Sequence, residues 1–462
     1  MRILVCIRKG LDGEINPFDA SAYEAALRIA GAEVMLISMG PPATKDFLSR
    51  LTRLGAKRAI LLCDSAFAGA DTLATAYALS LAVKKISPDL IFCGRQTLVG
   101  DTGQTGPMLS VLAKTSLITG VMAIGNVSDR DVTVETREQG EQSATFPALL
   151  TLERIHSLRL PSILSKLGTV EVWSADDVGA DRARCGLAGS PTRVLATFEN
   201  AAGKRKCTFV GADRLDAILG EALAQEKTRL APKQASEVRL SDVWCVGDAP
   251  RPFADSVSDD VTVVPLTSAA ELAARIQKER PRAVLWASDA VSKQMAACVA
   301  ALLGLGLCAD CTSLETDGEQ LIMYRPALSG SILAKIVSLT RPAMATVRTA
   351  QAAGDIVISA GFGAKDSLEA VRALATRLGA ELATTRKAVD HDILPYPLQV
   401  GLTGKTVSPP VYLAVGVSGA VHHIVGMQQA GTVIAINEDR DAPIFDYADY
   451  GIVARIEDVL GS

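Results

Sequence analysis

Two adjacent histidines, His422 and His423, lie within an uncharged stretch, since residues 406–437 contain no Asp, Glu, Lys or Arg. Glycine-rich segments accompany them, GLTGKTVSPP (401–410) and VGVSGAVHH (415–423), and Arg386 supplies a cation shortly before. Small residues that admit a close backbone approach, hydroxyl donors and a guanidinium suit a planar, anionic cofactor that bears phosphate. For His423 by itself, a histidine hydrogen-bonded within its own loop is the alternative.

A second glycine-rich segment, GRQTLVGDTGQTGP (94–107), follows an apolar run and precedes a predicted helix. Parallel sheets bind ligands at the carboxyl ends of their strands, and glycine N–H groups at a helix start attract phosphate. Thr102 and Thr105 offer hydroxyl donors, while Cys6 and the Asn16–Pro17–Phe18 turn would flank an adenine. No GK[ST] follows, so the segment is not a Walker loop. The alternative is a glycine-rich turn capped by Asp101 and Thr102.

Short apolar runs alternate with amphipathic segments along most of the chain, which predicts an α/β fold of doubly wound, mostly parallel sheets. We expect strands and helices in the following places: strands at 3–7, 33–38, 59–63 and 89–94, and helices at 19–30, 43–54, 71–86 and 104–113. LAVKKISPDLIFCGRQ (81–96) is echoed by AARIQKERPRAVLWASDA (273–290), which predicts two similar nucleotide-binding-type domains. Segment 125–160 alternates with period two and predicts antiparallel strands that close the first domain.

The organisation predicts three domains. The first is 1–240, with a C-terminal arm and linker over 168–240, and the second is 241–349, beginning with the strand DVWCVG. The third, 350–462, contains VYLAVGV (411–417) and GTVIAIN (431–437), which we expect to form buried parallel strands joined by a loop and a short helix. Pro409–Pro410, glycines and polar side chains argue against a membrane span in this region.

Composition excludes several classes of protein. A net charge of −4 without a basic block, and only 4% aromatic residues, make nucleic acid an unlikely partner. Nine scattered cysteines indicate a reducing compartment, and we expect a cytoplasmic location. Cys308-x-x-Cys311 lacks the further ligands of a structural zinc site, so we expect no metal there and interpret the pair as a buried helix–strand junction, with a redox pair as the alternative.

Taken together, these segments resemble the electron-transfer flavoproteins, with both subunits joined in one chain. MRILVCIRKGLDGEINPFDASAYEAALRI and PDLIFCGRQTLVGDTGQTGPML resemble the small β subunit. GLGLCADCTSLE, RPALSGSILAKIVSLTRPAMATVRT and everything from residue 355 resemble the large α subunit. The most specific block runs from TTRKAVDHDILPYPLQVGLTGKT through VYLAVGVSGAVHHIVGMQQAGTVIAIN to DAPIFDYADYGIV.

This resemblance implies an FAD in a C-terminal Rossmann-like domain. Arg386 would lie at the isoalloxazine, Thr403 near its N5, and His423 opposite its pyrimidine carbonyl. A guanidinium and an imidazole donor would then stabilise the charge of the reduced ring in a dry site. Asn437 would lie near the adenosine. The implied FAD contacts are Thr385, Arg386, Val400, Gly401, Leu402, Thr403, Ser418, Gly419, Ala420, Val421, His422, His423 and Asn437.

In the first domain the resemblance implies either AMP or a second FAD. GDTGQTGP (100–107) matches the form found in electron-bifurcating relatives, whose second FAD meets NADH, yet Gln104–Thr105–Gly106 also occurs in AMP-binding relatives. Val99 and Gly100 leave space and remove charge, which favours the second flavin slightly. The implied contacts are Cys6, Asn16, Pro17, Phe18, Gly94, Arg95, Gln96, Asp101, Thr102, Gln104, Thr105 and Gly106.

The resemblance implies an electron carrier rather than a substrate-specific enzyme. Its partners would be a dehydrogenase, acyl-CoA dehydrogenase being one type, and an acceptor such as a quinone oxidoreductase or ferredoxin. LRLPSILSK (158–166) resembles the dehydrogenase-recognition segment, with Leu160 as the anchor. An NADH-oxidising bifurcating flavoprotein is one alternative.

A non-redox adenine-nucleotide-binding protein is the other alternative, and departures from the family pattern motivate it. Phe362 replaces an Arg, Leu402 replaces a Gln, and Arg455 replaces an acidic residue. Loss of an Arg over the ring predicts a lower flavin potential.

Overall fold

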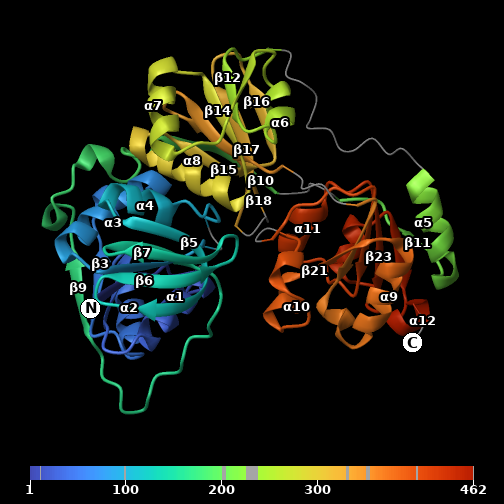
Figure 1. Cartoon of the computed structure of the whole chain (residues 1–462), viewed down its shortest axis with the longest axis horizontal. Coiled ribbons are helices and arrows are strands. Elements are labelled where there is room, and N and C mark those ends of the chain that lie inside the picture. The colour runs from blue at the N-terminus through green and yellow to red at the C-terminus, as the bar shows by residue number, and fades with distance from the viewer. Residues whose placement is uncertain are drawn as a thin grey trace. The chain divides into compact units, whose positions relative to one another are not determined.

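The computed structural model describes residues 1–10, 12–97, 100–199, 204–224, 238–328, 332–349, 354–401 and 404–460. These residues form two compact units, shown in Figure 1. Unit 1 comprises 1–196, 236–328 and 334–347, and unit 2 comprises 197–235, 329–333 and 348–462, each as far as it is described. The segment 168–240, which the sequence assigns to an arm and linker, is thus divided between the two units.

Unit 1 contains a nine-stranded sheet in the order β7-β6-β5-β8-β4-β1-β2-β3-β9. The strands are β1 (Arg2–Cys6), β2 (Glu33–Met39), β3 (Arg58–Leu62), β4 (Leu90–Gly94), β5 (Ser116–Val127), β6 (Asp131–Thr136), β7 (Gly140–Thr145), β8 (Ala148–Leu152) and β9 (Thr169–Trp173). The helices between them are α1 (Pro17–Arg28), α2 (Thr44–Thr52), α3 (Thr72–Ile86) and α4 (Thr105–Ala113).

Alternation along the central strands builds two cores, one on each face of this sheet. Ile3 and Val5 pack toward α1 and α2, whereas Leu4 packs toward α3 and α4, because successive side chains of a strand point to opposite faces. The four strands and four helices predicted for this region are confirmed.

The antiparallel prediction for 125–160 is right for one part and wrong for another. β5, β6 and β7 pair antiparallel. β8, by contrast, lies between β4 and β5 and is parallel to both. All five of its residues are buried, as expected of a strand covered on both faces, so its apolar run does not belong to the alternating pattern that precedes it.

The second half of unit 1 contains a five-stranded sheet in the order β13-β12-β14-β19-β15, with parallel pairing throughout. Its strands are β12 (Val243–Val246), β13 (Val261–Val264), β14 (Ala283–Ala287), β15 (Leu307–Cys311) and β19 (Ala343–Val347). Its helices are α6 (Arg251–Asp255), α7 (Ala269–Glu279) and α8 (Ala290–Leu303). Side chains of α8 join those of α4 in one hydrophobic core.

A four-stranded sheet, β10-β18-β17-β16, accompanies it. Its strands are β10 (Thr192–Glu199), β16 (Ser313–Thr316), β17 (Leu321–Ala327) and β18 (Ile332–Ser338). The interpretation of Cys308 and Cys311 as a helix–strand junction is wrong, because both lie within β15, next to an irregularity in its pairing with β19. Both thiols are buried and form no disulfide.

Unit 2 is built on a six-stranded sheet, β11-β24-β23-β22-β20-β21, whose pairs are all parallel. Its strands are β11 (Thr208–Phe209), β20 (Ile356–Ala360), β21 (Glu381–Thr384), β22 (Val411–Val415), β23 (Thr432–Asn437) and β24 (Tyr450–Val453). Its helices are α5 (Leu215–Ala224), α9 (Leu368–Leu378), α10 (Arg386–Asp390), α11 (Val421–Met427) and α12 (Ile456–Leu460). The buried parallel strands and short helix predicted for 411–437 are confirmed.

Both units therefore confirm the predicted α/β class with mostly parallel sheets. Within the described ranges, no helix has the length and apolar character needed to cross a bilayer.

Candidate functional sites

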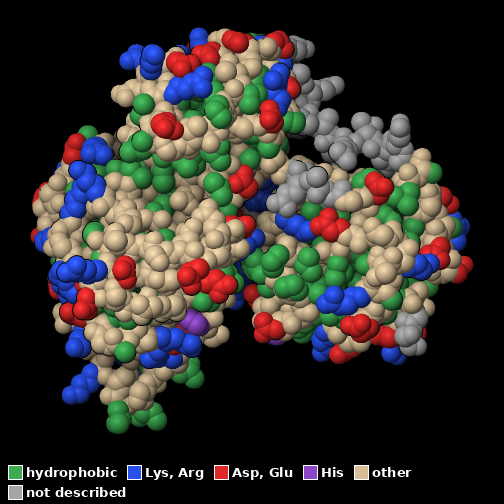
Figure 2. Space-filling model, viewed as in Figure 1, with side chains coloured by type: hydrophobic (Ala, Val, Ile, Leu, Met, Phe, Trp, Pro, Cys, Tyr) green, Lys and Arg blue, Asp and Glu red, His purple; other side chains and the backbone are tan. Residues whose placement is uncertain are grey.

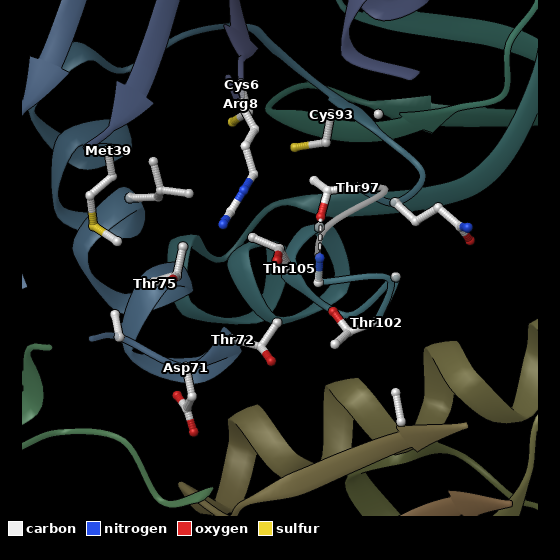
Figure 3. Close-up of a pocket in the computed structure, with 18 of the residues that line it drawn as sticks. Cys6, Arg8, Met39, Asp71, Thr72, Thr75, Cys93, Thr97, Thr102 and Thr105 are labelled. Carbon is white, nitrogen blue, oxygen red and sulfur yellow. Dashed lines mark hydrogen bonds between the residues drawn. The ribbon is translucent and has the colours of Figure 1, made fainter. Parts of the chain in front are cut away.

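A cavity of about 330 Å³ opens in unit 1 at the carboxyl ends of β1, β2 and β4. Figure 3 shows side chains from several elements directed into this space: Cys6 and Arg8 from the end of β1, Met39 from β2, Thr72 and Thr75 from α3, and Thr97, Thr102 and Thr105 from the glycine-rich loop and α4. Parallel strands and the helices that follow them thus bring hydroxyl groups and a guanidinium to one sheet edge.

The loop after β4 owes its path to internal hydrogen bonds. Gln96 Nε2 donates to Asp101 Oδ1 over 2.6 Å, and Gly100 N donates to Thr97 Oγ1 over 3.3 Å. Asp101 has a left-handed backbone, with φ of 53°. A Cβ at Gly106 would lie 2.6 Å from Thr151 Cγ2, so a side chain there would displace the start of α4. The N-cap residue of α4 is Gln104, without a side-chain cap, and of the two predicted capping residues Thr102 accepts a long hydrogen bond of 3.5 Å from Gln104 N.

A buried carboxyl and a buried guanidinium line this cavity, one from each half of unit 1. Asp19 accepts a hydrogen bond from Arg8 N over 2.8 Å, and burial raises the pKa of its carboxyl to about 7. Arg325, in β17, is 6% exposed, and its Nη2 donates to Asp101 O over 3.2 Å. Its buried Nε has no hydrogen-bond partner among the described residues, which fits an anionic ligand.

A second cavity of about 290 Å³ adjoins the first. The two share Arg95, Gln96, Thr102 and Gly103. The second continues past Thr119 and Arg137 to Lys293 on α8. Unit 1 therefore has two neighbouring cavities at this loop.

The residues predicted to bind a nucleotide in the first domain fall into two groups. Those that line the first cavity are Cys6, Gly94, Arg95, Gln96, Thr102, Thr105 and Gly106. Those that do not line it are Asn16, Pro17, Phe18, Asp101 and Gln104. The second group supports the first, since Asn16 Nδ2 donates to Gln96 O over 3.0 Å and Gln104 Oε1 accepts from Thr72 Oγ1 over 3.2 Å.

In unit 2, a cavity of about 190 Å³ lies where the segments after β21, β22 and α10 meet. It is lined by Thr385, Arg386, Lys387, Asp390, Gln399, Val400, Gly401, Val417, Ser418, Ala420, His422 and His423. Most of the predicted FAD contacts are among them. Gly419, Val421 and Asn437 do not line the cavity, and Asn437 Nδ2 donates to Val417 O over 2.9 Å. Leu402 and Thr403 lie outside the described residues.

The two histidines differ in what they contact. His423 is 5% exposed, its Nε2 lies 2.9 Å from Tyr412 Oη, and its Nδ1 lies 3.1 Å from Val400 O. Burial lowers its pKa to about 4, although the contact with Val400 opposes this. His422 Nε2 is buried without a hydrogen-bond partner among the described residues. Burial, together with the Arg386 charge, lowers the pKa of His422. Both rings are therefore neutral near pH 7.

Glycines hold these loops close to one another. Gly401 has φ of 139°, and a Cβ there would lie 2.6 Å from His422 O. Gly419 has φ of 88°, and a Cβ there would lie 2.1 Å from Ile444 N. A side chain at Gly401, which lines the cavity, or at Gly419, beside it, would therefore push these loops apart.

Comparison with known proteins bears directly on both cavities. A family model described as "Electron transfer flavoprotein domain" matches residues 3–178 and 256–373, and one described as "Electron transfer flavoprotein FAD-binding domain" matches 351–428. The chain belongs to the electron-transfer flavoprotein family. Its resemblance to both subunits is consistent with a fusion, and one domain model matches both of the segments predicted to be similar.

Individual proteins also match part of the chain. The protein FixA of Azorhizobium caulinodans is 39% identical over 246 residues, which is 49% of this chain and 87% of that protein. The electron transfer flavoprotein subunit beta of Thermoanaerobacterium thermosaccharolyticum is 40% identical over 202 residues, 41% of this chain and 78% of that protein. The caffeyl-CoA reductase-Etf complex subunit CarD of Acetobacterium woodii is 34% identical over 231 residues, 43% of this chain and 87% of that protein.

Family membership makes this chain a flavin-based electron carrier with an FAD-binding domain in its C-terminal part. The residues of unit 2 fit such a group, because a buried imidazole nitrogen without a hydrogen-bond partner among the described residues, a guanidinium and the backbone of Gly401 meet at one cavity. Its partners are therefore other electron-transfer proteins.

The sequence analysis missed several residues that the structure brings to the first cavity. Ser38 and Met39 end β2, while Asp71 and Thr72 begin α3. These residues lie near the ends of predicted strands at the same sheet edge, and this position could have identified them as site residues. Arg325 had no such signal, because it lies more than 200 residues from the loop it contacts.

Proposed function

We propose that the cavity of unit 2 holds the FAD and that His422, Arg386 and the loop 418–423 supply its polar contacts. The observation that carries this proposal is the buried His422 Nε2, which has no hydrogen-bond partner in the described part of the chain and belongs to the same cavity as Arg386. The ring nitrogens of His423 are already in contact with Tyr412 and Val400. Its predicted role opposite the pyrimidine carbonyl remains a prediction, and we favour His422 as the donor.

FAD supplies the electron transfer itself when it is bound. The chain's residues fix the surroundings of the ring. Arg386 presents a positive charge, His422 can donate a hydrogen bond as a neutral imidazole, and the buried His423 keeps Val400 in place through its Nδ1. A cation and preoriented donors in a water-poor cavity favour the negative charge that reduction brings.

In unit 1 we propose a second nucleotide, with its phosphates at the loop 94–106 and at Arg325. Two buried nitrogens, Arg325 Nε and Gln104 Nε2, have no hydrogen-bond partner among the residues that the structure describes, which supports an anionic, hydrogen-bonding ligand. The adjoining cavity favours FAD over AMP, because an adenine nucleotide that also carries an isoalloxazine needs the additional length. With a second flavin, the chain would oxidise NADH and divide its electrons, as electron-bifurcating relatives do.

Cofactors released from the purified chain and counted per polypeptide test both proposals. Two FAD per chain, with bleaching of flavin absorbance by NADH, supports the second flavin. One FAD and one AMP supports a carrier with a structural nucleotide. One FAD and nothing else refutes the unit 1 site, and a colourless chain that takes up no added FAD refutes the unit 2 site.

For the partner we propose a dehydrogenase that docks on the loop between β8 and β9. Leu160, Ile163 and Leu164 are 90%, 96% and 89% exposed, and Figure 2 shows hydrophobic side chains at the tip of this loop. The base of the loop is fixed, since Arg159 forms an ion pair of 2.9 Å with the buried Glu24 and Gly168 N donates to Thr52 Oγ1 over 2.8 Å. Apolar side chains on a fixed base suit a docking anchor. We expect an acyl-CoA dehydrogenase type of donor, and a quinone oxidoreductase or ferredoxin as acceptor.

A further inference from the structure

One aromatic ring beside the unit 2 cavity is surrounded by basic side chains. Phe362, partly exposed, begins the short 3-10 helix Phe362–Ser367 after β20. Lys387 Nζ lies 4.4 Å from the centroid of its ring, and Lys365 Nζ lies 5.4 Å from it. The His391 ring packs against it at 4.8 Å between centroids. The two ammonium groups repel each other, so attraction to the ring must offset this repulsion.

The two lysines differ in their relation to the cavity. Lys387 lines it, next to Arg386, whereas Lys365 does not. Lys365 Nζ lies 3.9 Å from Asp366, while Lys387 forms no ion pair with a carboxylate in the part of the chain that the structure describes. Arg386, in contrast, has Asp390 3.7 Å away, which offsets part of its charge. Lys387 therefore brings an uncompensated positive charge to the cavity wall.

The aromatic ring explains how an exposed lysine is kept there. A lysine side chain has four rotatable bonds, and its ammonium group is strongly hydrated, so it would otherwise extend into solvent. The negative face of an aromatic ring attracts the ammonium group and restricts these conformations. Phe362 thus holds the ammonium group of Lys387 in position, although its own side chain is uncharged.

We propose that Lys387, held over Phe362, stabilises the negative charge of the reduced flavin and thereby raises its potential. This inference rests on the proposed position of FAD in the unit 2 cavity. It adds a second cation to Arg386, and among the described residues this cation, unlike Arg386, has no carboxylate in ion-pair contact.

Lys387→Gln tests the inference, because it keeps most of the side-chain length and removes the charge. We expect the preference for reduced over oxidised FAD to fall about tenfold, which lowers the potential of a two-electron couple by about 30 mV. Affinity for oxidised FAD should stay within about twofold. Low ionic strength keeps screening of this exposed charge small. Spectroelectrochemical titration gives the potential, and dialysis of the oxidised chain gives the affinity.

Three matched variants sharpen the test. Lys365→Gln removes a charge from the same ring but from outside the cavity, and should leave the potential unchanged. Lys387→Arg should restore the wild-type potential. Phe362→Leu should give part of the Lys387→Gln effect and add nothing to it in the double variant, as expected when one residue acts through the other.

An unchanged potential in Lys387→Gln with FAD still bound overturns the inference. So does an equal shift in Lys365→Gln, which would indicate a general surface field, or an equal loss of affinity in both redox states, which would indicate contact with the FAD pyrophosphate. Failure of the underlying proposal is recognised separately, because a Gly419→Ala chain that retains all its FAD would show that FAD does not occupy this cavity.

Discussion

The first cavity of unit 1 and the cavity of unit 2 both lie at the carboxyl ends of parallel strands, but they differ in their buried ionisable side chains. The first cavity of unit 1 has a buried carboxyl, Asp19, a buried guanidinium, Arg325, and a ring of threonine hydroxyls. The cavity of unit 2 has two neutral histidines and adjacent basic side chains at Arg386 and Lys387. Parallel sheets bind nucleotides at the carboxyl ends of their strands. The charges of the side chains at that edge then determine how strongly a site stabilises a reduced, negatively charged ring.

The largest effect is expected at a glycine whose loop packs closely against backbone beside the unit 2 cavity. Gly419→Ala places a Cβ 2.1 Å from Ile444 N at φ of 88°. It should therefore displace the loop 418–423 and abolish FAD retention in unit 2. Gly379→Ala is the matched control, because its φ of 60° imposes similar backbone strain while nothing lies within 4 Å of the added atom. Flavin content after gel filtration distinguishes them, and equal loss in both variants would attribute the effect to backbone strain alone.

The buried groups His423 and Asp19 predict opposite responses of the two units to pH. His423 has a folded pKa of about 4, below its ordinary value of 6.5, so the unfolded chain binds more protons between these values and unit 2 loses stability as pH falls from 6.5 to 4. Asp19 has a folded pKa of about 7, above its ordinary 3.8, so the folded chain binds more protons and unit 1 loses stability as pH rises from 4 to 7. Each contribution is of the order of a few kcal/mol.

Denaturant unfolding at several pH values, followed by pulse hydrogen exchange at one fixed labelling pH, measures each unit separately. Amides in unit 1 peptides should become less protected from hydrogen exchange as the pH rises. Amides in unit 2 peptides should become less protected as the pH falls. His423→Gln and Asp19→Asn should each flatten one profile and leave the other unchanged. Parallel profiles in the two units would contradict the assignment of these two groups.

Arg386→Ala tests how much of the unit 2 charge acts on the flavin. The resemblance and the cavity both predict that it lowers the flavin potential and weakens FAD retention, by about 1.5–3 kcal/mol at most, as for a hydrogen bond to a charged group. Arg377→Ala is a matched control, since Arg377 is exposed and pairs with Asp216 away from the cavity. Potential and FAD content that match the wild type would remove Arg386 from the site.

Much of the fold was accessible from the sequence, because local patterns specify it. Apolar runs predicted the strands around residues 3–94, and the uncharged stretch 406–437 predicted β22, α11 and β23. The failures were non-local. β8 is inserted between β4 and β5, and its own residues do not determine that it pairs parallel to both.

The candidate sites show the same limit. Glycine-rich loops identified both cavities, but which histidine has a partnerless nitrogen depends on Tyr412 and Val400, which contact His423. Arg325 contacts a loop more than 200 residues away. A lower flavin potential was predicted because Phe362 replaces an Arg. The structure places Lys387 and Lys365 beside the Phe362 ring, so positive charge lies next to this position. The cation expected at that position is absent, yet two others lie next to it.

The smallest effect on the protein itself is expected on the surface of unit 1. Leu160→Ser should leave stability and FAD content unchanged, since the side chain is 90% exposed and contributes little buried area. If the loop docks the partner, the same change should slow electron transfer from a reduced dehydrogenase, while reduction by dithionite, which needs no docking, stays at the wild-type rate. Leu187→Ser is the matched control, because Leu187 is 63% exposed and lies outside the loop. A slower rate with Leu160→Ser alone would assign docking to unit 1 and leave the basic cavity of unit 2 to tune the flavin, whereas equal rates in both variants would remove this loop from the partner interface.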